Sequence, residues 1–148
     1  MAFHFSLQPV LRLRLSLEER ERLRLALIIG YLNQLNAHRQ QLDEDKLQIS
    51  NSLAERLKVG LLAAELHFER ARMSSIDKQK QFLLQQIAKL EQQRVAQEQA
   101  FREAQRNRKI LEKLREDQYE LYRLELARRE QQRVDDLFGL RHARLEKS

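Results

Sequence analysis

Residues 76–138 read IDKQKQFLLQQIAKLEQQRVAQEQAFREAQRNRKILEKLREDQYELYRLELARREQQRVDDLF and contain neither glycine nor proline. Over the wider interval from Val10 to Phe138 the only glycines are Gly30 and Gly60, and the one proline, Pro9, precedes it. Average usage is about 7% Gly and 5% Pro. The interval is filled instead with Leu, Glu, Gln, Arg, Ala and Lys, which lose least on entering a helix. The stretch therefore predicts very long helices in place of a compact globule.

The composition agrees with that reading. Charged residues make up 34% of the 148 positions and aromatic residues only 6%, and there is no tryptophan. This profile is typical of a long helix or coiled coil. The net charge of +6 arises from 28 basic and 22 acidic residues that are interspersed along the chain, which indicates a solvated face. The most basic stretch, Arg102 to Arg115, lacks interleaved aromatics beyond Phe101, so we expect it to pair with acidic side chains or a protein and not with nucleic acid.

Several classes of protein are disfavoured by what the sequence lacks. There is no cysteine, so disulfides and thiolate metal sites are absent, which fits a reducing cytoplasm. No apolar run approaches the ~18 residues of a membrane span. The start, Met-Ala-Phe-His-Phe, does not have the charged and apolar regions of a secretory signal. We expect a cytoplasmic protein.

Apolar residues recur at the alternating steps of three and four that a heptad requires. One line runs from Leu11 to Leu53 in a single phase, with polar residues such as Arg39 and Lys46 at some positions. After Leu53 the apolar phase slips, and the later stripes are Leu57–Ala71, Leu83–Ala104 and Ile110–Arg128. The polar positions predict a weak coiled coil.

Two signals compete for the point where the chain turns back. Gly60 costs a helix interior about 1 kcal/mol relative to alanine. Ser74-Ser75 followed by Asp77 resembles a capping start, and it lies at the midpoint of the helical interval. We predict a single coiled-coil domain over 1–148, with a first helix at about 9–59, a break zone at 60–75 that has room for a short helix, and a second helix at about 76–138.

A turn near residue 74 makes a charge register that can be checked. Residues whose numbers sum to about 148 would then face each other, which places Arg12 and Arg14 opposite Asp135 and Asp136. The acidic run at 43–45 would face Arg102 and Arg106. Both pairings join opposite charges, as flanking positions of antiparallel helices should.

The first residues can be interpreted in two ways. Phe3 and Phe5 either fold back as a hydrophobic staple on the first helical turns or form an exposed anchor.

The sequence contains no group of residues typical of a catalytic site. The four histidines are scattered without metal-binding spacing, and there is no glycine loop of the kind that binds phosphate. Nothing predicts a pocket that would perturb an acidic pair. We expect no enzyme activity, no catalytic or metal site, no cofactor and no small-molecule ligand.

Two stretches resemble the flagellar FliJ family. The first is Phe3-His-Phe-Ser-Leu7-Gln-Pro-Val10-Leu11-Arg-Leu-Arg14 followed by Glu18-Glu19, which is similar to the family's opening of spaced aromatic and aliphatic residues before an arginine and a Glu-rich helix. The second resembles the family's Arg-Lys-x-Leu-Glu-Lys-Leu segment and its terminal Asp-Glu element. It reads Arg108-Lys109-Ile-Leu111-Glu112-Lys113-Leu114, then Tyr119 or Tyr122, then Glu130-Gln131 and Val134-Asp135-Asp136. In this chain Asp136-Leu137-Phe138 replaces the usual Glu followed by small residues.

The resemblance implies an all-α fold, a long antiparallel two-helix coiled-coil hairpin similar to the central stalk of rotary ATPases. It also implies a component of the flagellar type III export apparatus, needed for motility and chemotaxis, that lies in the cytoplasm and associates peripherally with the cell membrane at the flagellar base. Its implied partners are the export ATPase hexamer, the membrane export gate and the export chaperones. The alternatives are a generic coiled-coil scaffold and the equivalent stalk of a virulence type III secretion system.

The hairpin reading predicts a monomeric rod, and the resemblance implies that its termini-bearing end engages the ATPase ring. Charged rims steer docking, which makes five arginines the candidate partner-binding residues. Their alternative role is pairing within the hairpin with Asp135, Asp136 and the acidic residues at 18–21. The five are Arg12, Arg14, Arg128, Arg129 and Arg133.

Overall fold

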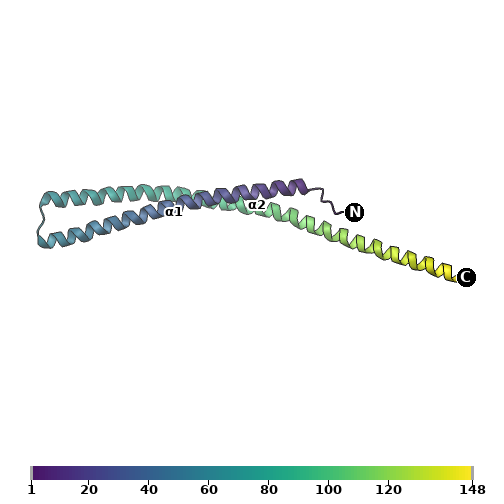
Figure 1. Cartoon of the computed structure of the whole chain (residues 1–148). Coiled ribbons are helices and arrows are strands. Elements are labelled where there is room, and N and C mark those ends of the chain that lie inside the picture. The colour runs from purple at the N-terminus through teal and green to yellow at the C-terminus, as the bar shows by residue number, and fades with distance from the viewer. Residues whose placement is uncertain (1, 148) are drawn as a thin grey trace. The chain divides into compact units, whose positions relative to one another are not determined.

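The computed structural model describes residues 2–147, and over that range the chain is all-helical with no strand. Helix α1 spans Gln8–Val59 and helix α2 spans Ala63–Glu146. Pro9 lies in the first turn of α1, where its missing N–H leaves no hydrogen bond unmade. In Figure 1, α1 and α2 run side by side in opposite directions on the way to the short connection between them. The predicted all-α pair of long, packed antiparallel helices is confirmed.

The chain divides into two compact units. The first, here called the turn unit, is Glu19–Arg102. The second, here called the termini unit, contains the residues up to Glu18 and those from Glu103 onward. Both helices continue through the division without a break. That residues 1–148 form one domain stays a prediction.

The connection between the helices is short and depends on Gly60. This residue has φ = 110°, which is the left-handed region that side chains disfavour, and its N–H donates to the carbonyl oxygen of Arg56 at 3.1 Å. Helix α2 then begins at Ala63, so most of the predicted break zone at 60–75 is helical and belongs to α2. Ser74 and Ser75 are exposed inside α2, and the helix continues past them because the flanking residues have high helix propensity. The helix also continues to Glu146, beyond the predicted end at 138.

The heptad line predicted for α1 is confirmed by burial. Leu32, Leu42 and Ile49 are among the few buried apolar residues of the chain, and the other positions of that line are buried or half-buried. Figure 1 shows α2 running beside α1 in the turn unit. Because a two-helix pair has only one shared face, no large side chain is fully enclosed among the described residues.

The predicted phase slips in α2 are wrong. Phe68, Ile110 and Leu121, which defined two of the slipped stripes, are 63%, 59% and 66% exposed. The Leu83–Ala104 stripe is confirmed, and the same heptad phase continues in both directions, with Arg115 as its one exposed position between Leu66 and Tyr122. Its members are the buried or half-buried residues Leu66, Glu69, Met73, Ile76, Lys80, Leu83, Ile87, Leu90, Arg94, Gln97, Phe101, Ala104, Arg108, Leu111, Gln118 and Tyr122.

Several polar residues lie on this packed face of α2 because they pair with residues of α1. In the turn unit Lys80 Nζ lies 2.6 Å from Asp43 Oδ1, and Gln97 Nε2 donates to both the backbone and the carboxylate oxygens of Glu21. Glu69, 7% exposed, faces Arg56 with 3.6 Å between Oε1 and Nη1. Buried polar groups that are paired avoid the cost of desolvation. The apolar residues of α2 alone therefore do not identify which of its faces packs against α1.

These pairs also correct the predicted charge register. Asp43 pairs with Lys80, and Lys46 pairs with Asp77 at 2.6 Å, so facing residues have numbers that sum to about 123 and not 148. The acidic run at 43–45 therefore does not face Arg102 or Arg106. The register follows from the turn at 60–62, since the first residues after a tight turn must pair with those just before it.

Candidate functional site: the unit that carries both chain ends

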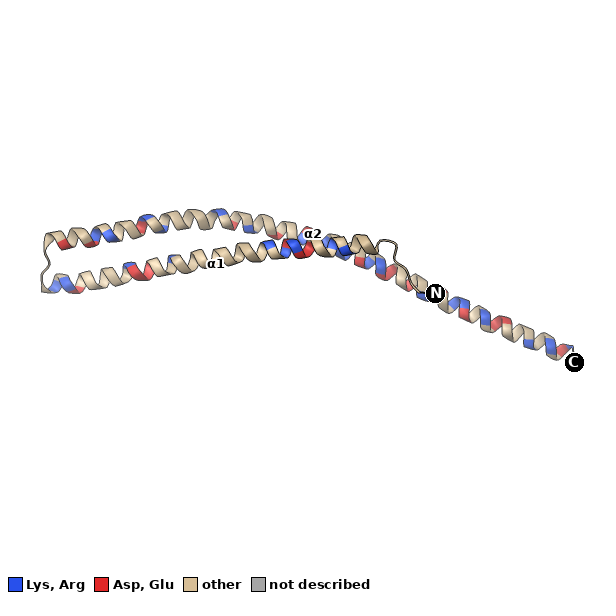
Figure 2. Ribbon diagram, turned by 45° about the horizontal axis from the view of Figure 1, so that its top comes forward, with Lys and Arg blue, Asp and Glu red and all other residues tan. Residues whose placement is uncertain are grey.

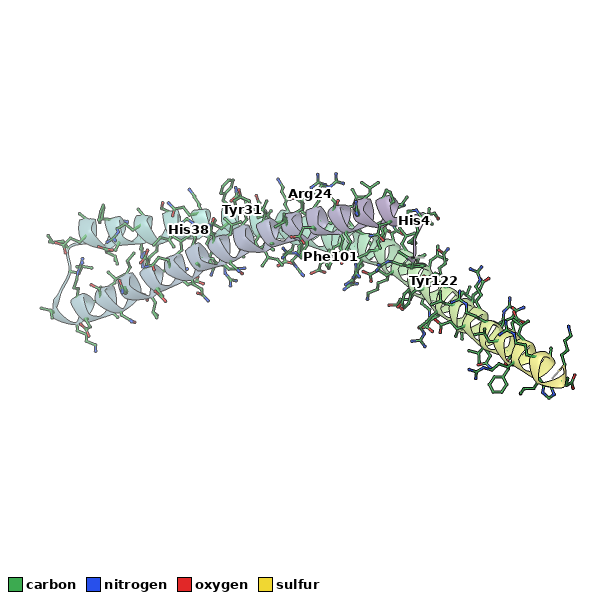
Figure 3. The ribbon with its side chains drawn as sticks, turned by 45° about the vertical axis from the view of Figure 1, so that its right-hand side comes forward. His4, Arg24, Tyr31, His38, Phe101 and Tyr122 are labelled. Carbon is green, nitrogen blue, oxygen red and sulfur yellow. The ribbon has the colours of Figure 1, made fainter. Side chains whose placement is uncertain are left out.

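The N-terminal segment of the termini unit is docked on α2 by an aromatic cluster. The ring of Phe3 lies 5.3 Å from Tyr119 and 5.6 Å from Tyr122 between centroids, and the two tyrosine rings are 6.4 Å apart. Phe5 is 4% exposed and Leu11, on the first turns of α1, is equally buried. Figure 3 labels His4 and Tyr122 on the two elements that meet here. The phenylalanines therefore fold back, as in the staple reading, but Phe3 packs on the partner helix and not on its own.

An ion-pair group behind this cluster fixes the two helices to each other. Arg108 Nε donates to the Glu18 carboxylate across the pair, and Arg108 Nη1 lies 2.6 Å from Glu112 Oε2 one turn along α2. The hydrogen bond that Arg108 donates to Glu18, followed by the one that it donates to Glu112, raises the pKa of Arg108. Both Glu18 and Arg108 are largely covered, with 15% and 17% of their side chains exposed. The beginning of α1 is thereby held in register against α2.

A shallow groove lies beside the docked segment. Phe3, Phe5 and Pro9 form its apolar part, and Arg12 and Arg115 lie along it. Its volume is about 540 Å³. None of its lining residues is acidic.

The last part of α2 lies open to solvent. Every described residue from Arg123 to Lys147, here called the free arm, is exposed. Leu137, Phe138 and Leu145 expose 58%, 71% and 73% of their surface. Val134, Phe138 and Arg141 line a shallow groove on it of about 420 Å³. Exposed apolar patches rimmed by charge are typical of protein-interaction sites.

The free arm carries charge of both signs. It holds seven Lys and Arg residues against five Asp and Glu residues, and the colours along the end of α2 in Figure 2 alternate accordingly. Several of these charges are paired within the helix, such as Arg129 with Glu125 at 3.2 Å. Local pairs of this kind contribute only about 0.3–0.5 kcal/mol and are easily exchanged for contacts with a partner.

The five predicted partner-binding arginines all lie in the termini unit, but the structure does not bring them together. Arg12 is exposed in the groove beside Arg115, and Arg14 is half-buried on the face of α1 that packs on α2. Arg128, Arg129 and Arg133 are exposed on the free arm. At about 1.5 Å per residue, the 13-residue step from position 115 to 128 separates the two groups by about 20 Å.

Their alternative role, pairing inside the hairpin with Asp135, Asp136 and the acidic residues at 18–21, has no ion pair to support it among the described residues. Asp135 accepts a hydrogen bond from Gln131 Nε2 at 3.2 Å on its own helix, and Glu18 is occupied by Arg108. Arg12 faces the level of Arg115 and not that of Asp135 and Asp136. The free arm extends past the start of α1, because the turn at 60–62 makes α2 the longer helix.

Sequence reasoning missed Arg115 and the two tyrosines. One signal was available for each. Tyr119 and Tyr122 are three residues apart and so lie on one face of a helix. Arg115 has only one acidic residue, Glu112, at the helical spacing of three or four, and Arg108 already holds it. A cation without a local counter-charge is a better marker of a free basic site than its mere position in a basic stretch.

No metal or membrane chemistry is indicated for the described residues. Within residues 2–147, no three His, Asp or Glu side chains are grouped as a metal ion would need. Neither α1 nor α2, over that same range, has a stretch apolar and long enough to cross a membrane.

The comparison with known proteins finds one family. A protein-family model described as "Flagellar FliJ protein" matches residues 3–147, which is nearly the whole chain. No curated protein and no solved structure matches the chain.

Proposed function

Because the chain belongs to the flagellar FliJ family, and is therefore a component of flagellar type III protein export, we propose that it binds the export ATPase hexamer through the termini unit. The contact surface is roughly residues 10–25 of α1 with residues 122–138 of α2. Arg12 and Arg14 on the first element and Arg128, Arg129 and Arg133 on the free arm are its charged contacts.

The observation that carries this proposal is the free arm. Residues 123–144 of α2 are exposed at every position, and they present apolar and basic side chains together. Isolated helices are marginal in water, and most helical stability comes from packing an apolar face. A chain that leaves such a helix unpaired is best explained by a partner that packs on it.

The mechanism follows from symmetry. A single pair of helices has no rotational symmetry that matches a hexamer, so it must contact the subunits of the ring unequally. It can then favour one catalytic state over another at different positions of the ring, within the limit set by its differential affinity. If it binds the ring and not the free subunit, it also favours ring assembly by mass action.

The remaining roles of the chain are proposed on the family alone. It contacts the membrane export gate, assists the export chaperones, and works on the cytoplasmic face of the membrane at the flagellar base in support of motility and chemotaxis. It acts as a single domain comparable to a rotary-ATPase stalk, and it has no catalytic activity, cofactor, nucleic-acid partner or small-molecule ligand of its own.

The test is charge reversal on the free arm. We expect the triple variant R128E/R129E/R133E to lose stimulation of the export ATPase while its helicity is unchanged, because the reversed charges repel the docking rim. The matched control is R102E/R106E/K109E, three exposed cations elsewhere on α2. Stimulation by a folded free-arm variant equal to that of the wild type would move the interface elsewhere.

Two alternatives give different results in the same experiment. A stalk of a virulence secretion system would stimulate the ATPase of that system and not the flagellar one. A generic scaffold would stimulate neither, and it would self-associate through its long apolar faces.

A further inference from the structure

The groove beside the N-terminal segment has an uncompensated positive charge. Arg12 and Arg115 come from different helices and lie along the same concavity, which has no acidic residue in its lining. Neither arginine is found in an ion pair or side-chain hydrogen bond among the described residues, whereas many other cations of the chain are paired.

The sequence explains why these two charges stay free. A helical arginine normally pairs with an acid three or four positions away. Those positions around Arg12 hold Gln8, Pro9, Leu15 and Ser16, and around Arg115 they hold Leu111, Glu112, Gln118 and Tyr119. The single acid in that set, Glu112, is bound by Arg108 at 2.6 Å.

Besides the two arginines, the groove is lined by the polar residues His4 and Gln8 and by an apolar part that is fixed in place. Phe3 is held by the tyrosine cluster, Phe5 is buried, and Pro9 is restrained by its ring and by the start of α1. A surface held by its own packing loses little freedom when it binds a ligand. The volume of about 540 Å³ suits one or two side chains of a partner and not a folded domain.

We propose that this groove binds an acidic peptide segment of a partner protein, in which Asp or Glu lies next to a large apolar residue. The carboxylates pair with Arg12 and Arg115, since charge-assisted arginine–carboxylate bonds are among the strongest protein hydrogen bonds. The apolar residue packs on Phe3 and Pro9. Two cations are too few for the phosphate backbone of a nucleic acid, which is held by many contacts. The ligand chemistry stands independently of which export protein supplies it.

The experiment measures the binding of synthetic peptides to the full chain by fluorescence anisotropy. The probe is a labelled Gly-Glu-Asp-Phe-Asp-Glu-Gly peptide, and the reference probes replace either all four acids by Gln and Asn or the Phe by Ser. We expect the acidic Phe peptide to bind, and each reference peptide to bind about tenfold or more weakly, because each lacks one of the two contacts.

Variants then locate the site. We expect R12Q/R115Q to weaken the acidic Phe peptide by about tenfold or more. The control R102Q/R106Q removes the same charge from exposed positions outside the groove, and we expect it to stay within about twofold of wild type. Circular dichroism verifies that both variants are folded.

Four results would overturn the proposal. The first is that the acidic Phe peptide does not bind, and the second is that both variants weaken its binding equally. The third is that the Ser peptide binds equally well and is displaced by inorganic phosphate, which would mean an adventitious ion only. The fourth is that the wild-type chain self-associates and R12Q/R115Q abolishes this, which would make the occupant a second copy of this chain.

Discussion

Gly60 and Gly30 have opposite expected effects on the stability of the fold. Gly60 ends α1 with φ = 110°, while Gly30 lies in the middle of α1 and has open space around the position of a Cβ atom. We predict that G60A lowers the free energy of unfolding by about 1–2 kcal/mol, the cost of a left-handed conformation. We predict that G30A raises it by about 0.5–1 kcal/mol.

Urea unfolding followed by circular dichroism measures both changes. The pair is its own control, because each variant adds the same methyl group to α1 or its end. If G60A were as stable as the wild type, the turn would not require the backbone conformation described here.

Asp43 gives a residue-scale prediction about pH. The hydrogen bond from Lys80 lowers the pKa of Asp43 below its ordinary value of 3.8. A carboxylate with a lowered folded-state pKa stabilises the fold above its unfolded pKa, and this contribution is lost as the pH falls through the folded value. We predict that D43N is less stable than the wild type at neutral pH and that the difference disappears once the pH falls below the lowered folded-state pKa of Asp43.

The measurement is thermal unfolding of D43N and E44Q between neutral and acidic pH. Glu44 is the neighbouring exposed acid without a cross-helix partner among the described residues, so E44Q should differ little from wild type at any pH. Because Asp43 and Lys80 are 44% and 35% exposed, salt should shrink the effect. A D43N difference that persists in acid would mean that the ion pair is not its cause.

At the scale of the elements, the sequence predicted the two helices and the packed face of α1 but not the turn or the phase of α2. The helices follow from helix propensity and the lack of Gly and Pro, which are local properties. The predicted heptad line from Leu11 to Leu53 is correct because it included the polar residues Arg39 and Lys46 at the positions that the heptad spacing requires. The phase of α2 was misread where apolar residues were followed past Arg108 and Gln118, which lie on the packed face.

The turn and the candidate site depend on pairing that one helix does not reveal. Equal arm lengths favoured residue 74, whereas Gly60, the earlier signal, is the residue with the left-handed backbone. Charge complementarity did not distinguish the correct register of the two helices from others, because a chain with 28 basic and 22 acidic residues places opposite charges together in many registers. Arg12 was found as an exposed cation, but its neighbour Arg115 emerges only once the true register brings the two helices together.

The register itself can be tested with cysteines, since the native chain has none. We predict that D43C/K80C is joined within one chain by a short bismaleimide, because the native side chains are in contact at 2.6 Å. The control D43C/R102C tests the register that a turn near residue 74 would require. Its second cysteine lies 22 residues further along α2, or about 33 Å, so we expect no intramolecular product. Efficient linking of D43C/R102C would contradict the turn at 60–62.

The free arm yields a prediction about dynamics. We expect backbone amides in residues 123–146 to exchange with deuterium faster than those in residues 83–111, because only the latter pack against α1 and unpaired helices open easily. Hydrogen exchange with mass spectrometry measures this directly. Adding the export ATPase should slow exchange in the free arm, and an arm equally protected before and after addition would contradict its role in binding.

At the scale of the whole molecule, the two units divide the chemistry between them. The turn unit contains most of the buried apolar residues and the cross-helix ion pairs that set the register. The termini unit contains the aromatic cluster, the basic groove and the free arm. Most of the buried packing therefore lies in the turn unit, and the surfaces for which we propose partners lie in the termini unit.

The most direct test of this account is photo-crosslinking to the export ATPase from one position in each unit. Phe138 on the free arm and Leu62 beside the turn are matched in exposure, at 71% and 70%. With benzoylphenylalanine at either position of the full chain, the account predicts a crosslink to the ATPase from position 138 and none from position 62. A crosslink from position 62 without one from position 138 would contradict it.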